Sequence, residues 1–501
     1  MARMFLCGAV AAACAGTASA AELVTAVQHY QQADFVAARA ELGELAAIGQ
    51  PEAQALFGQL LMRGEGGPAD LASGYGWLLA AVDNGFKQAQ DQADKLRVLL
   101  SKLPPNQQQA GNDVLKRNGR AGLHETLLPD NRDMNFCAGA EGNQPFEDVM
   151  PEFPRAARFN ARDSDVLVEF KVGVDGLPRE PEILAAFPQG DLFAEPSIRA
   201  VLRSRLRPAT VGGHPVESNF RIDIKFRIIG GGTLWRSAGL LALVEQANAG
   251  SPAAEFLLGS AALVDPQEFR IPFANAFGLV LKSAQAGQPL SQYWISRELS
   301  ARSLCGKSEK AARWLLIAVE SGAPGAELER ARQLLVAEAP VEARTEAKRL
   351  LVKVAQSNSE FAARLAIGIL ATTPFDDVRD PATAAKAMDS LKADAYDKDP
   401  QTWESFAAVH AATGRYWDAI KQEERALELA REYRWNTAAM GERLAAYKAK
   451  KAWLGDLLVL PPVPDPGPPP STVESCEKTN FKPPCLEIRR AAPAKPTAPA
   501  T

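Results

Sequence analysis

The sequence contains few residues whose types and spacing suit catalysis or metal binding. Its histidines, His29, His124, His214 and His410, are scattered, and no Cys/His spacing resembles a zinc site. Gly-x-Ser-x-Gly, His-Glu-x-x-His and dinucleotide-binding glycine patterns are absent. The glycine-rich residues 64–67 lack the following Lys-Ser/Thr of a phosphate-binding loop, so we interpret them as a turn between helices. We therefore expect no enzymatic activity, no cofactor and no metal.

The first 20 residues have the features of an export signal. Arg3 precedes an apolar stretch, residues 4–16, and Thr17-Ala18-Ser19-Ala20 has the small-x-small pattern that signal peptidase cleaves. The apolar stretch is shorter than the roughly 20 residues that span a bilayer. We predict a cleaved signal peptide, and the alternative is an N-terminal core helix. Lipid anchoring at Cys14 is a further alternative.

Disulfide formation is the chemistry that export makes available to the remaining cysteines. Cys476 and Cys485 lie close together in a Pro-rich segment, where a disulfide would close a short loop worth roughly 2–3 kcal/mol. We predict this disulfide, and the alternative is two free thiols. Cys137 and Cys305 are isolated in the sequence, and we expect Cys305, which precedes Gly306, to be a small packed residue.

Most of the chain has the pattern of helical repeats. Glycines recur about every 36 residues, and each is followed four positions later by a small residue. The pairs are Gly49 and Ala53, Gly85 and Ala89, Gly250 and Ala254, Gly287 and Ser291, and Gly322 and Ala326, with Asn358 and Ala362 next. Gly or Asn suits a helix C-terminus that turns through positive φ. A period of this length is typical of helix pairs in an α-solenoid.

Individual repeats resemble a known class. Trp77 and Trp314 lie eight residues before Gly85 and Gly322, and Ala-rich helices surround both. This pattern resembles the Sel-like class of tetratricopeptide repeats, most specifically at residues 52–89. Other segments, residues 23–49 and 403–430, resemble plain tetratricopeptide units.

A stretch between the two helical arrays has period-two alternation. Residues 166–174 carry Val or Phe at every second position, which predicts a strand with one buried face. Asp175-Gly176 then predicts a hairpin with a type I′ turn. The returning residues 177–184 contain Pro178 and Pro181, so this strand is expected to be short, irregular or at an edge.

The same stretch continues with a helix and a long strand. Residues 192–206 have a helical pattern, with Ile198, Val201 and Leu202 expected inside. Residues 220–228 alternate apolar and polar side chains and predict a two-faced strand. In a sheet of three strands such a strand has an unpaired edge unless something covers it, and an exposed edge accepts an extended peptide.

Residues 147–230 resemble the TonB C-terminal domain. The resemblance rests on Pro151-x-Phe153-Pro154-x-x-Ala157-Arg158, on the alternating strand with Asp175-Gly176, on Leu206-x-Pro208-Ala209, on Gly213-x-Pro215-Val216 and on the final strand. It implies a periplasmic domain that binds an outer-membrane receptor segment by strand addition. The implied docking residues are Phe220, Arg221, Ile222, Asp223, Ile224, Lys225 and Phe226, with Pro151, Phe153 and Pro154 near the bound peptide. The alternative is a structural spacer whose edge is covered by the flanking helices.

The predicted fold is mainly α: an α-solenoid of Sel-like/tetratricopeptide helix pairs with an inserted small α+β domain of about three antiparallel strands and a helix. The expected order is a signal peptide (1–20), repeats (21–103), a linker with some helix (104–146), the TonB C-terminal-like domain (147–230), repeats (231–457) and a Pro-rich tail (458–501). A net charge of -4 gives no reason to expect nucleic acid.

We therefore expect a periplasmic protein–protein interaction scaffold of the cell envelope, without a membrane span, whose partner is an extended peptide segment of an envelope protein such as an outer-membrane receptor. The alternative is a TonB-type energy transducer for transmembrane transport, anchored by an uncleaved N-terminus. The internal position of the TonB-like domain departs from that alternative, because a transducer places this domain at its C-terminus.

Overall fold

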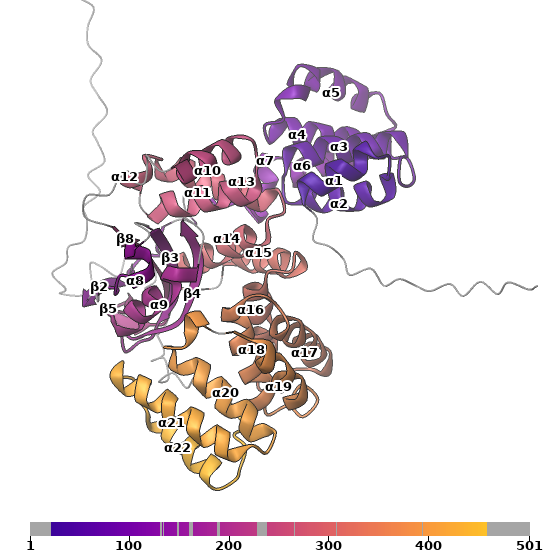
Figure 1. Cartoon of the computed structure of the whole chain (residues 1–501). Coiled ribbons are helices and arrows are strands. Elements are labelled where there is room, and N and C mark those ends of the chain that lie inside the picture. The colour runs from indigo at the N-terminus through magenta and orange to yellow at the C-terminus, as the bar shows by residue number, and fades with distance from the viewer. Residues whose placement is uncertain are drawn as a thin grey trace, which may run out of the picture.

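The computed structural model describes residues 22–457, except 131–132, 134, 148–149, 160–163, 188–190, 228–237, 265, 307 and 393. The described chain is mostly helical and encloses one small antiparallel sheet region, which confirms the predicted fold class (Figure 1). The predicted signal peptide, Cys14 and the tail that carries Cys476 and Cys485 lie outside the described residues.

The N-terminal helices pack on one another in sequence order, and α6 also packs on α4. They are α1 (Leu23–Gln31), α2 (Phe35–Ala47), α3 (Pro51–Arg63), α4 (Leu71–Asp83), the 3₁₀ helix η1 (Lys87–Gln92), α5 (Ala93–Ser101), α6 (Pro105–Asn118) and α7 (Arg120–Thr126). Helices α4 and α6 approach closely, because a Cβ on Gly76 would lie 2.4 Å from the carbonyl oxygen of Gly111. Residues 104–146, predicted as a linker with some helix, thus contribute α6 and α7.

The C-terminal helices form a longer curved array in which each helix again packs on its neighbours. They are α10 (Ala238–Asn248), α11 (Pro252–Val264), α12 (Pro266–Phe269), α13 (Phe273–Gln285), α14 (Pro289–Arg302), α15 (Glu309–Glu320), α16 (Pro324–Leu334), α17 (Val341–Ala355), α18 (Glu360–Thr372), α19 (Pro381–Ser390), the 3₁₀ helix η4 (Asp394–Tyr396), α20 (Pro400–Ala412), α21 (Tyr416–Glu432) and α22 (Ala438–Lys448).

The recurring glycines lie where the sequence places them, just after helix C-termini. Gly49, Gly85, Gly250, Gly287 and Gly322 have φ values from 81° to 104°. The small residues that follow by four are buried at 0–2% exposure where the structure describes their side chains, at Ala53, Ala254, Ser291, Ala326 and Ala362. The prediction for Asn358 is wrong in one respect, because its φ is not positive. Between α3 and α4, Gly64 and Gly66 make the expected inter-helix turn, with φ of 70° and 73°.

The two arrays touch each other on the side of α1 and α2. The amide of Leu23 donates to the carbonyl oxygen of Ala286 at 3.0 Å, and Nε2 of Gln285 donates to that of Ile48 at 3.2 Å. Leu42 and Leu45 share a buried apolar cluster with residues of α13, α14 and α15. Segments that precede and follow the inserted domain therefore form one continuous packed body.

The inserted domain is built on a three-stranded antiparallel sheet with strand order β4-β3-β8. Its strands are β3 (Ser164–Val172), β4 (Pro178–Phe187) and β8 (Ser218–Phe226), and its helices are α8 (Arg155–Phe159), the 3₁₀ helix η2 (Asp191–Phe193) and α9 (Ala194–Arg203). Short strands complete it: β1 (Ala140–Glu141), β2 (Gln144–Glu147), β5 (Arg205–Arg207), β6 (Ala209–Val211) and β7 (His214–Val216). In Figure 1 the sheet lies within the curve that α10 to α22 trace.

Two local predictions need correction, and a third is confirmed. The hairpin between β3 and β4 exists, but Gly176 has positive φ (74°) and Asp175 does not, so the turn is not type I′. Strand β4 is an irregular edge strand with register shifts, as expected from its prolines, and it is ten residues long. The predicted helix 192–206 ends at Arg203, because the chain then enters β5 and pairs with β2. Its predicted interior residues Ile198, Val201 and Leu202 are indeed buried.

Candidate docking strand and its buried polar interface

Strand β8 forms one edge of the sheet and contains every predicted docking residue from Phe220 to Phe226. It pairs with β3 along its whole length, from Ser218 opposite Val172 to Phe226 opposite Ser164. Among the described residues no strand pairs with its other side. Helices α11 and α14 approach β8, and residues 218–223 are half-buried while Lys225 is exposed. Ile228, predicted as the end of this strand, lies outside the described residues.

The apolar side chains of β8 join the core between the sheet and α9. Ile224 and Phe226 are buried in a cluster with β3 and α9, and Phe220 and Ile222 pack against that cluster. The ring of Phe226 contacts that of Phe193 with centroids 4.7 Å apart. This face fixes the strand register, because a slip by one residue would turn the apolar side chains away from α9.

The predicted residues Pro151, Phe153 and Pro154 lie at the C-terminal end of β8. The ring of Phe153 packs edge-on against Phe226, with centroids 5.8 Å apart. With residues of α9 the three line a pocket of about 260 Å³. The structure thus brings this segment to one end of the predicted docking strand, through Phe153.

The opposite face of the sheet is also buried, so the prediction of one buried face is wrong. Leu167 and Leu184 pack into the cluster that contains Trp294 and Ile295 of α14. The carboxylate residue Glu169, expected to face solvent, is 0% exposed. Charged residues are tolerated on this buried face because α14 supplies opposite charges, and a buried charge is stable only beside such partners.

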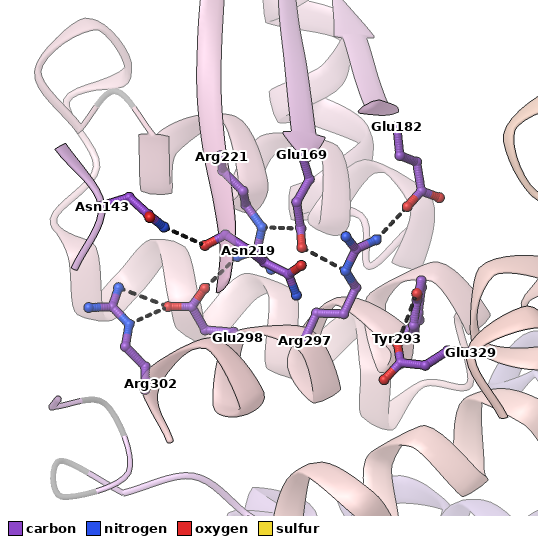
Figure 2. Close-up of polar contacts among 10 residues, drawn as sticks. All are labelled: Asn143, Glu169, Glu182, Asn219, Arg221, Tyr293, Arg297, Glu298, Arg302 and Glu329. Atoms are coloured by element: carbon purple, nitrogen blue, oxygen red, sulfur yellow. Dashed lines mark hydrogen bonds and ion pairs between the residues drawn. The ribbon is translucent and has the colours of Figure 1, made fainter. Parts of the chain in front are cut away.

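A chain of ion pairs joins this polar face to α14 (Figure 2). Arg221 of β8 pairs with Glu169 of β3 and with Glu298 of α14. Arg297 of α14 pairs with Glu169 at 2.6 Å and also with Glu182 of β4. The chain ends at Arg302, whose guanidinium lies 2.9 Å from Glu298. Alternating signs therefore link all three strands of the sheet to one helix.

Burial and the neighbouring charges shift the pKa values of two carboxyls in this chain of ion pairs in opposite directions. Burial by itself would raise the pKa of Glu298, but the neighbouring Arg221 and Arg302 outweigh it and lower that pKa. For Glu182, burial prevails and raises the pKa in spite of Arg297. The guanidinium of Arg221 also lies 4.2 Å from the ring centroid of Trp294, a cation–π contact. Arg221 is thus held from three directions.

A second ion cluster attaches the far edge strand, β4, to the C-terminal array. Glu180 accepts two hydrogen bonds from Arg332 of α16, at 2.8 and 2.9 Å, and its carboxylate lies 3.0 Å from Lys171. Arg332 and Lys171 lower the pKa of Glu180 far below its ordinary value although burial opposes them. The backbone amide of Glu180 donates to Gln401 of α20 at 3.0 Å. This edge is therefore covered.

A disulfide between Cys137 and Cys305 closes the interface near the start of β8. Its Cα atoms are 6.1 Å apart and its sequence separation is 168 residues. The prediction of Cys305 as a small packed residue is wrong, because the fold brings the end of α14 to the segment before β1. Nearby, Asn143 donates to the hydroxyl of Ser218 at 2.7 Å and accepts from the amide of Ala209 at 2.8 Å.

Sequence reasoning did not identify α14 as part of this site. All of its residues from Ser291 to Leu299 are buried, polar ones included. That burial leaves no amphipathic pattern, because polar and apolar residues of this helix are buried alike. Arg297, Glu298 and Arg302 gave no distinguishing signal, because charged residues are at least as dense in other helices, for example at residues 327–332.

The described part of the chain shows neither a metal-binding cluster nor a helix that could span a membrane. There, no three or more His, Cys, Asp or Glu side chains gather in a way that suits a metal ion. None of the helices within residues 22–457, apart from the gaps given above, has the length and apolar character needed to cross a bilayer.

Comparison with known proteins identifies one segment. Residues 149–228 match the family described as the Gram-negative bacterial TonB protein C-terminal. No curated protein matches the chain. The Sel-like and tetratricopeptide interpretation of the flanking helices stays a prediction. The matched range contains β3, β4, α9 and β8, so the inserted sheet is the part of the chain that is similar to the C-terminal domain of Gram-negative bacterial TonB proteins.

Proposed function

We propose that this protein is an exported, non-enzymatic interaction scaffold of the Gram-negative cell envelope. Its TonB-like sheet binds an extended peptide segment of another envelope protein, which adds as a strand along the outer side of β8. The observation that supports this proposal is the strand order β4-β3-β8 within residues 149–228, the segment similar to the TonB protein C-terminal. The outer side of β8 pairs with no strand among the described residues.

Strand addition suits β8 for a physical reason. The added strand makes main-chain hydrogen bonds, which supply affinity, and its alternate side chains contact the surroundings, which supplies specificity. Pairing with β3 along nine residues and the anchoring of Arg221 already order β8. The scaffold therefore loses little conformational entropy when a peptide docks.

The helical arrays hold the TonB-like sheet in a fixed position. Ion pairs to α14 and α16 and the contact with Gln401 of α20 hold the polar face and the β4 edge. Among the described residues, the outer side of β8 is then the edge left for a partner strand. This arrangement favours a docking module with a rigid frame over the mobile tip of an energy transducer.

Site-specific photocrosslinking in intact cells tests the proposal. We place p-benzoylphenylalanine at Lys225, which is exposed on β8, and as a control at Glu428, which is exposed on α21. The expected result is a crosslinked product of one envelope protein from Lys225 that is absent from the Glu428 control. Equal products from both positions, or none from Lys225, would contradict strand addition at β8.

The N-terminus of the mature chain distinguishes the energy-transducer alternative from the scaffold proposal. We expect N-terminal sequencing of material recovered in the soluble periplasm to begin at Ala21. A chain that begins at Met1 and stays in the membrane fraction would favour the transducer instead.

A further inference from the structure

A second candidate binding site is a cleft between the two helical arrays. Its volume is about 970 Å³, and it is lined by the C-terminal half of α2, by the end of α6, by α7, and by α14 and α15. Its apolar lining includes Leu45, Ile48 and Leu123, which are buried, and Leu316, which is 43% exposed. A volume of this size is at the upper end of small-molecule sites and accommodates a short peptide segment.

One side-chain oxygen in the cleft accepts no hydrogen bond from the described residues. A comparison of two glutamines at corresponding positions shows why. Gln54 and Gln292 occupy the same place in two repeats, five residues after Gly49 and Gly287. Each donates Nε2 to the carbonyl oxygen eight residues earlier, Gln54 to Ala46 and Gln292 to Ala284, at 3.1 Å in both cases. The two side chains are 0% and 1% exposed.

The two glutamines differ in whether their Oε1 atom accepts a hydrogen bond. Oε1 of Gln54 accepts from Nδ2 of Asn84 at 2.9 Å. The corresponding residue of the later repeat is Ser321, which precedes Gly322 as Asn84 precedes Gly85. Serine is shorter, and Oε1 of Gln292 has no donor among the described residues. Both Gln292 and Ser321 line the cleft. A buried acceptor without a donor is costly, so this atom favours a ligand with an N–H group.

Two carboxylates in the same cleft favour a cation. Glu44 of α2 and Glu320 of α15 form no ion pair within the described part of the chain, and they lie close enough that partial burial and the charge of Glu320 both raise the pKa of Glu44. The lining also includes a third acid, Glu125, and three bases, Lys116, Arg117 and Arg313. Acidic and basic side chains are therefore balanced along the cleft. Selection of a basic ligand depends on the local pair Glu44 and Glu320 rather than on the net charge of the cleft.

We propose that this cleft binds a peptide segment of another protein that places a lysine or arginine side chain at Glu44 and Glu320 and donates an N–H to Oε1 of Gln292. Backbone amides of a peptide supply the donor, a basic side chain supplies the charge, and neighbouring apolar side chains cover Leu316 and the cleft floor. This site is separate from the outer side of β8, because no residue of β8 lines the cleft. The scaffold thereby holds two partner segments at once.

Two peptide libraries and the full-length protein test this proposal. Both libraries contain nine-residue peptides randomised among Ala, Leu, Ser and Glu, and their central residue is lysine in one and norleucine in the other. We expect the protein to retain the lysine library at least tenfold more strongly in affinity selection read by mass spectrometry. The variant Ser321→Asn adds the amide that the earlier repeat provides through Asn84, and it should reduce retention at least tenfold.

Matched variants separate the charge effect from damage to the fold. Glu44→Gln with Glu320→Gln should lower retention of the lysine library to the norleucine level, whereas Glu428→Gln on α21 should leave it unchanged. Equal retention of the two libraries, or full retention by Ser321→Asn, would overturn the proposal. The chain's own tail carries Arg489 and Arg490. If reversing both charges to Glu raises retention tenfold, the tail is the occupant and the proposal of a foreign partner is wrong.

Discussion

Arg221 of β8 and Glu298 of α14 form an ion pair across the boundary between the TonB-like sheet and the helical array (Figure 2). The same guanidinium pairs with Glu169 of β3. One side chain of the predicted docking strand therefore joins that strand both to its sheet and to the surrounding helices. The order of β8 and the attachment of the sheet to the helical array depend on the same residue.

Replacing Arg221 with methionine should destabilise the domain by about 2–3 kcal/mol, because it leaves buried carboxylates short of a partner. The loss is smaller than for an isolated buried pair, since Glu169 keeps Arg297 and Glu298 keeps Arg302. Chemical denaturation followed by tryptophan fluorescence measures the change in free energy of unfolding. Arg415→Met, at an exposed pair with Asp418, is the control and should cost at most about 1 kcal/mol. Equal effects of both variants would contradict the buried-network interpretation.

The sequence predicted the architecture well because periodicity reports the secondary-structure type directly. The glycine period of about 36 residues placed the helix ends, and alternation at residues 166–174 and 220–228 placed the strands. Both signals are local. They depend on backbone geometry and on whether one face of an element is apolar, and both can be inferred from the residues of a single segment.

The partners across the fold were not predictable from local pattern. Glu169 and Arg221 look like solvent-facing residues of amphipathic strands. Glu169 is buried and Arg221 is half-buried because α14, more than 70 residues later in the chain, supplies Arg297 and Glu298. Cys137 and Cys305 pair over 168 residues for the same reason. In both cases the residues next to each member of the pair give no indication of its distant partner.

Proline substitution at adjacent positions of β8 tests its outer side. In an antiparallel strand, neighbouring residues direct their N–H groups to opposite sides, so Asp223 and Ile224 differ in whether the N–H faces β3. We expect one of Asp223→Pro and Ile224→Pro to weaken the sheet and the other to abolish partner crosslinking from Lys225 with a smaller loss of stability. The helical circular dichroism of the arrays should persist in both. Undiminished crosslinking in both variants would argue against strand addition, and loss of helical signal would indicate a structural role for the domain.

The Cys137–Cys305 disulfide should stabilise the protein by constraining the unfolded chain. A loop of this length corresponds to roughly 5 kcal/mol in the chain-entropy model, an upper value because the two arrays already contact each other. Alkylation of the unreduced exported protein, followed by mass spectrometry, should leave both cysteines unmodified. Cys137→Ser with Cys305→Ser should lower the denaturation midpoint, and a reducing agent should have no further effect of that size on the double variant. The predicted Cys476–Cys485 disulfide is checked in the same spectrum. Its removal should cost about half as much, roughly 2–3 kcal/mol, because the loop is short.

Helices α20 and α21 contain a pair of buried acids that should make stability depend on pH. Glu404 and Glu423 flank the buried Arg443, which pairs with Glu404 and lies 3.6 Å from Glu423. Burial, opposed by Arg443, raises the pKa of Glu404 to about 7. Burial and the charge of Glu404 raise the pKa of Glu423 to about 9.

An acid whose pKa is higher in the folded than in the unfolded state keeps its proton longer when folded. Its contribution to stability is complete below about pH 4.5, the unfolded value, and is lost as the pH rises through the folded value. We therefore expect the free energy of unfolding to fall between about pH 5 and pH 9, and Glu423→Gln to flatten that fall. Denaturation series at pH 5, 7 and 9 measure it, with Glu428→Gln at an exposed position of α21 as the control. A wild-type protein whose stability rises over this range, or the same slope in Glu423→Gln, would contradict the assignment of Glu423 as the responsible group.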